Sequence, residues 1–202
     1  MQHALPVLLA SAFLAVSTLS AQAEATGSLE RDIVAIEATL AADPAAALPA
    51  LQDLVGQLTA AARTSPEAAA ASPAQIARAL SAAAAAAAAS GLPATVIADL
   101  LAGITATATR AFADLGAIAP PAALSTAIAS VAGSVADAAG SALGSPQPAL
   151  AAALSDMVAG LPEGTSPDVA DALAGAIAGV ASGGGDTGGS DGDDGPVSAS
   201  AN

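Results

Sequence analysis

The chain contains no cysteine, lysine, tryptophan or tyrosine, and its single histidine is His3. Without cysteine it forms no disulfide framework and offers no thiolate as a nucleophile or metal ligand. The absence of lysine, tyrosine and any later histidine removes most of the usual general bases, activated nucleophiles and nitrogen ligands. The acidic run at residues 191–195 also lacks the spacing of an EF-hand loop. We therefore expect a protein that is not an enzyme and holds no cofactor or metal.

Positive charge is also scarce, because 18 acidic residues face only four arginines and the net charge is −14. A field of this sign repels nucleic acid and anionic membrane surfaces, so we expect no nucleic-acid partner. Aromatic residues make up 1% of the chain, and its 54% hydrophobic content consists largely of alanine. Alanine favours helices strongly but buries little area, so we expect a helical body of modest stability.

The first 23 residues have the pattern of a secretory signal peptide. An apolar segment at residues 5–16 precedes a stretch of small residues that ends in Ala21-Gln22-Ala23, an A-x-A cleavage pattern. The apolar segment is shorter than the roughly 20 residues that span a bilayer. We expect cleavage between Ala23 and Glu24, and a secreted or periplasmic protein.

Prolines and small polar residues divide the next part of the chain into segments with apolar residues three or four positions apart, the period of a helix. We expect helices at 28–42, from Pro49, at 72–91, 93–115, 121–142, 148–161 and 167–181. Pro49 would break a helix that started at Pro44, so we place the start of the second helix there. Ser72 and Pro73 have the chemistry of an N-cap and a first helical residue, after a short turn of helix opened by residues 64–67.

The segment at 93–115 carries the widest apolar stripe and Phe112, so we place it at the centre of the body. Thr105, Thr107 and Thr109 alternate with alanine along it, a weak strand-like pattern, and we expect a solvated helix of reduced propensity there instead. The turns are short, which makes consecutive helices antiparallel neighbours. The fold class we expect is all-α over residues 24–181. An irregular antiparallel bundle and a stack of alanine-rich helical hairpins both fit.

Residues 182–202 consist mainly of glycine, aspartate and serine, so little in them can be buried. This composition predicts a disordered acidic C-terminal tail.

Glycines spaced four residues apart are the one further pattern. Gly140 and Gly144 form one G-x-x-x-G motif, and Gly175 and Gly179 form another that continues to Gly183. Such spacing lets helices pack closely, and in lipid it marks faces where helices associate. We expect a non-catalytic exported protein that acts by surface contact, as an envelope, matrix or partner-binding component. The alternative is a membrane-active protein that inserts these small-residue helices into a bilayer.

Overall fold

The computed structural model describes residues 27–163 and 165–183, which form helices joined by turns and contain no strand. The predicted all-α class is therefore confirmed. The predicted signal peptide, its cleavage site at Ala23 and Glu24, and residues 184–202 of the predicted tail lie outside the described residues.

The described chain begins within a helix that ends at residue 42. The six helices that follow are α2 (Pro44–Ala62), α3 (Pro66–Ala89), α4 (Ala94–Leu115), α5 (Pro121–Ala142), α6 (Pro148–Ala159) and α7 (Pro167–Ser182). The last helix runs one residue beyond the predicted limit. Proline occupies the first helical position of five of these six helices, where its missing N–H is not needed.

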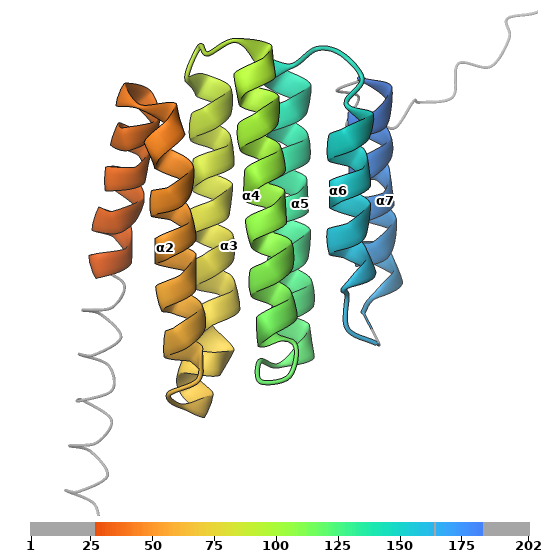
Figure 1. Ribbon diagram of the computed structural model, residues 1–202. Helices are drawn as coiled ribbons and strands as arrows, with labels where there is room; N and C mark the ends of the chain where they lie inside the picture. The colour runs from red at the N-terminus through yellow and green to blue at the C-terminus, as the bar shows by residue number, and fades with distance from the viewer. Residues whose placement is uncertain (1–26, 164, 184–202) are drawn as a thin grey trace, which may run out of the picture.

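The labelled helices stack as hairpins in two layers, with α2, α4 and α6 in one and α3, α5 and α7 in the other (Figure 1). Each helix packs on the next along the chain and on the one after that. The arrangement is the stack of helical hairpins, one of the two architectures that the sequence left open. Helices of the same layer run parallel, because two reversals of direction separate them. The helix at 27–42 covers the end of the stack that α2 and α3 form (Figure 1). There Glu30 forms an ion pair with Arg78 of α3.

Alanine makes up much of the core. Ala84 and Ala87 of α3 and Ala132 of α5 are fully buried, and so small a side chain allows neighbouring helices to approach closely. Larger residues fill the spaces that remain, and the biggest fully buried ones include Ile76, Leu80, Leu101, Ile104, Leu115, Ile128 and Leu154. The apolar stripe predicted for the first helix is likewise buried, at Leu29, Ile33, Ile36 and Leu40.

The second helix begins at Pro44, so its predicted start at Pro49 is wrong. The carboxylate of Asp43 caps α2 by accepting a hydrogen bond from the N–H of Ala45 at 3.1 Å. Pro49 lies inside the helix with its ring exposed, and it leaves the carbonyl of Ala45 without its helical donor. The cap and the burial of Ala47 favour the longer helix despite that loss.

The predicted start of α3 at Ser72 is also wrong, because the helix runs without a break from Pro66. Ser65 is the cap, and its hydroxyl oxygen accepts a hydrogen bond from the N–H of Ala68 at 3.1 Å. Ser72 is buried instead, and its hydroxyl donates to the carbonyl of Ala68 at 2.7 Å. Ser65-Pro66 and Ser72-Pro73 both have the sequence of a helix start, and the helix begins at the earlier pair.

The central position predicted for α4 agrees with its packing, since it contacts α2, α3, α5 and α6. The prediction of a helix at its threonines is confirmed, but their predicted solvation is wrong for two of them, because Thr105 is 0% and Thr107 6% exposed. Their hydroxyls donate to the carbonyls of Leu101 and Gly103, both at 2.8 Å. A threonine whose hydroxyl bonds to its own helix in this way can be buried without an unpaired donor.

Candidate functional site

The glycines of the two predicted motifs lie mostly on the surface. Gly140 and Gly175 are exposed on α5 and α7, and Gly179 is half-buried. Gly144 follows α5 in a left-handed conformation, with a φ of +57°, as is common just after a helix ends. No atom lies within 4 Å of the place where a Cβ would stand on Gly144 or Gly175. Their part in close helix packing stays a prediction, because the contacts within this chain leave their faces open.

Close approach of helices occurs instead at Gly103, where α4 meets α2. A Cβ at this position would stand 2.5 Å from the Cδ2 atom of Leu48. Gly183, with a φ of +70°, makes a second close approach, since a Cβ there would lie 2.5 Å from the backbone nitrogen of Pro146. Beside it, the N–H of Gln147 donates to the carbonyl of Val180 at 2.9 Å. These contacts join helix ends and faces that are distant in the sequence.

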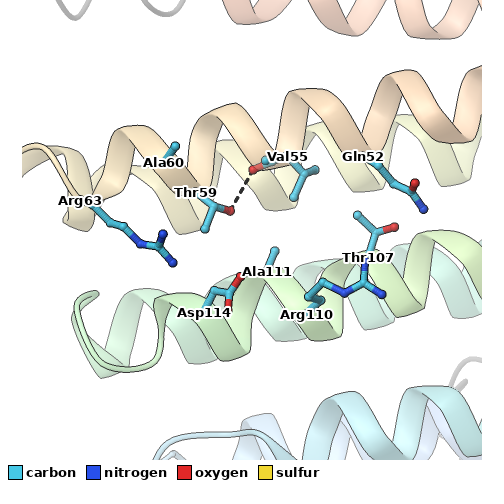
Figure 2. Close-up of a pocket in the computed structure, with 10 residues that line it drawn as sticks. Gln52, Val55, Thr59, Ala60, Arg63, Thr107, Arg110, Ala111 and Asp114 are labelled. Atoms are coloured by element: carbon cyan, nitrogen blue, oxygen red, sulfur yellow. Dashed lines mark hydrogen bonds between the residues drawn. The ribbon is translucent and has the colours of Figure 1, made fainter.

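A pocket of about 200 Å³ lies between the C-terminal halves of α2 and α4, on the outer side of their layer (Figure 2). We call it the arginine pocket, and its lining is Gln52, Val55, Gly56, Thr59, Ala60, Arg63, Thr107, Arg110, Ala111 and Asp114. Arg63 follows the last residue of α2 and extends toward α4, on which Arg110 and Asp114 lie (Figure 2). The parallel course of the two helices brings these three charged residues to the same end of the layer.

The charges of this pocket are unusual for the molecule. Arg78 forms the ion pair with Glu30, and the Nε–H of Arg31 donates to the carbonyl of Gly27 at 3.0 Å. The guanidinium groups of Arg63 and Arg110 have no ion pair or hydrogen bond with any of the described residues. Half of the arginines of a strongly acidic chain therefore line one pocket without a partner there.

The floor of the arginine pocket is mainly apolar. Val55, Thr59, Thr107 and Ala111 are buried there. The Thr59 hydroxyl donates to the carbonyl of Val55 at 2.8 Å (Figure 2), as that of Thr107 does to Gly103. Each hydroxyl proton is thus engaged within its own helix, so neither threonine has a free donor for a ligand. Gly56 adds no side chain, and nothing lies within 4 Å of the place where its Cβ would stand.

A second pocket, of about 370 Å³, lies between the N-terminal ends of the same two helices. Its lining is Asp43, Pro44, Ala45, Leu48, Val96, Asp99 and Leu100, and we call it the acidic pocket. Leu48 of this lining is the residue that meets Gly103 of α4. Asp43 at the N-cap and Arg63 at the C-cap of α2 match the dipole of that helix, since acids are favoured at helix N-termini and cations at C-termini. The α2/α4 side of the stack therefore carries opposite charges at its two ends.

The residues that the structure describes contain no group of three or more His, Asp or Glu side chains that could hold a metal ion. The expectation of no metal, no cofactor and no catalysis stays a prediction for the chain as a whole.

Comparisons with protein-family models, with curated proteins and with solved structures found no match. The arginine pocket is therefore interpreted from its own chemistry.

Neither pocket was predicted from the sequence. Arg63 and Arg110 lie 47 positions apart on two separate helices, so their joint position depends on α2 packing beside α4. The one signal in the sequence is their rarity, together with their place near the C-terminal end of each helix. That signal marks the residues without showing that they meet.

Proposed function

We propose that the protein is an exported, non-catalytic helical protein that acts by surface contact, as an envelope, matrix or partner-binding component. The observation that carries this proposal is the α2/α4 side of the stack, where an arginine pocket and an acidic pocket lie at opposite ends of two parallel helices. Stacked helical hairpins form extended faces that many proteins use for binding. A partner with complementary charges would be held in one orientation along such a face.

Export rests on the signal-peptide pattern of residues 1–23, and mass spectrometry of the protein from its native host tests it. The expected result is a mature chain that begins near Glu24 and contains no peptide from residues 1–23. Intact Met1 or His3 peptides in most of the folded protein would contradict export with cleavage.

A membrane-active protein is the competing proposal, and one observation favours it. Among the described helices, α4 and α5 are long and apolar enough to cross a bilayer, judged by length and composition alone. About half of the most apolar window of each, 50% in α4 and 44% in α5, is buried inside the stack. Insertion would have to separate α4 from α2, α3, α5 and α6, which makes this the weaker proposal.

Liposome flotation separates the two proposals. Purified mature protein is mixed with neutral vesicles and with anionic vesicles, each at low and at high salt. Surface contact with a protein or envelope partner predicts recovery in the aqueous fraction without detergent under all four conditions. Flotation of most of the protein with neutral vesicles would overturn it in favour of insertion. Flotation with anionic vesicles at low salt alone would also contradict it, because it would identify a charged lipid surface as the target.

A further inference from the structure

We infer that the arginine pocket binds a small monocarboxylate, an organic acid with a short apolar body. The inference concerns the chemistry of one pocket, and it holds or fails independently of export and of any macromolecular partner.

The sign and size of the ligand charge follow from the lining. Arg63 and Arg110 contribute two positive charges and Asp114 one negative charge, so the lining carries one net positive charge. The net charge of the whole chain, −14, repels an anion in this pocket only weakly. Charges more than about 8 Å away are largely screened at physiological ionic strength. A monovalent anion neutralises the single net positive charge of the lining. A phosphate dianion would leave one net negative charge in the pocket, next to the carboxylate of Asp114.

The donors favour a carboxylate among monovalent anions. A guanidinium group is planar and presents paired N–H donors that match the two oxygens of a carboxylate. Arg63 comes from the end of α2 and extends toward Asp114, whereas Arg110 of α4 extends toward Thr107 and Gln52, so the two guanidinium groups line different ends of the pocket (Figure 2). The exposed amide of Gln52 lines the same pocket and can donate a further hydrogen bond.

The floor selects the rest of the ligand. Val55, Ala111 and the methyl groups of Thr59 and Thr107 offer apolar surface that an inorganic anion would leave uncovered. A volume of about 200 Å³ is below the usual range for drug-sized ligands, so the apolar body must be short. An acid with a chain of a few carbons places its carboxylate at one of the two guanidinium groups and its methyl end on this floor.

The helix dipoles supply a competing explanation. Arg63, at the C-cap of α2, would stabilise that helix without any ligand, and Arg110 would act as a solvated surface cation. On that explanation Arg63 affects thermal stability, and no carboxylate is bound. The two explanations differ in two observable ways. Only carboxylate binding predicts that the NMR signals of the pocket residues shift when the acid is added, and only carboxylate binding predicts that the shifts depend on each arginine.

The test is an NMR titration of the folded protein with butyrate, and with inorganic phosphate and butylammonium as separate probes. We expect saturable shifts at Thr59, Thr107 and Ala111, with a Kd of about 1 mM because the site is open to solvent. Arg63→Gln and Arg110→Gln should each weaken butyrate binding by about tenfold, as expected for loss of a charged hydrogen-bond donor. Arg31→Gln is the matched control, because Arg31 lies on the first helix away from the pocket, and it should bind as the parent does.

A second variant fills the pocket and leaves the arginines in place. Gly56→Leu introduces a side chain where nothing lies within 4 Å of the Cβ position, so the helices need not move. It should abolish the butyrate shifts while the circular dichroism spectrum stays that of the parent. The inference is overturned if butyrate causes no saturable shift, if Gly56→Leu or both arginine variants bind as the parent does, or if phosphate or butylammonium binds more tightly than butyrate.

Discussion

Glu67 lies in the first turn of α3, two positions after the capping residue Ser65. Hydrogen bonds from its own backbone N–H and from the Ser65 hydroxyl lower the pKa of the Glu67 carboxyl below its ordinary value of 4.5. A carboxyl whose pKa is lower in the folded state stabilises the fold above the unfolded pKa, and this contribution is lost as the pH falls through the folded pKa.

Glu67→Gln should therefore melt at a lower temperature than the parent at pH 7 and at the same temperature at pH 2. Thermal melts followed by circular dichroism at both values check this. In a Ser65→Ala background the difference at pH 7 should shrink, because one of the two hydrogen bonds is already missing. An equally large difference at pH 2 would contradict the assignment.

Two adjacent alanines of the polyalanine run in α3 have opposite environments. Ala84 is fully buried, and Ala85 is exposed. Ala84→Leu should destabilise the protein by about 1–3 kcal/mol, because a close-packed core has no room for the added carbons. Ala85→Leu should change stability by less than about 0.5 kcal/mol. Urea unfolding of the two variants measures the difference, and equal effects would show that α3 is rotated relative to its neighbours.

At the scale of whole elements, the length of α2 depends on a proline inside it. Pro49→Ala restores an N–H that can bond to the carbonyl of Ala45 and removes an exposed ring from the helix, so little packing is lost. An interior proline costs a helix about 3 kcal/mol, while its restriction of the unfolded chain returns up to about 1 kcal/mol. We expect the variant to gain about 2 kcal/mol in a denaturant titration. A helix that began at Pro49 would instead lose stability on this change.

The stability of the stack should depend strongly on α4, which, like α5, contacts four other labelled helices. Leu101 and Phe112 are buried on it, and truncating such residues to alanine costs about 2–5 and 3–5 kcal/mol respectively. Ordinary domains have only about 5–15 kcal/mol in total, so Leu101→Ala and Phe112→Ala should largely unfold the protein in thermal melts. Val34→Ala is the control, because Val34 is 60% exposed, and it should melt as the parent does. If both α4 variants also melted with the parent, α4 would not be the centre of the fold.

For the molecule as a whole, the sequence predicted those features that short stretches of chain decide. The prolines at 121, 148 and 167 start helices as expected, and the apolar stripe from Leu29 to Leu40 is buried, because these signals act within a few residues. The starts at Pro49 and Ser72 were wrong where capping by Asp43 and Ser65 and burial in the stack outweighed local proline chemistry. The arginine pocket could not be predicted from the sequence, because it forms only where α2 and α4 lie side by side, and α3 separates these two helices along the chain.

The order in which the helices pack also determines how cooperatively the molecule can unfold. Among the labelled helices, each contacts only the next two along the chain in either direction, and none links α2 directly to α6 or α7. Such nearly one-dimensional arrays lose their end units before their middle, since opening an end breaks the fewest interfaces. Amide hydrogen exchange should therefore be slowest in α3, α4 and α5 and faster in α6 and α7, a gradient that a single all-or-none transition would not show.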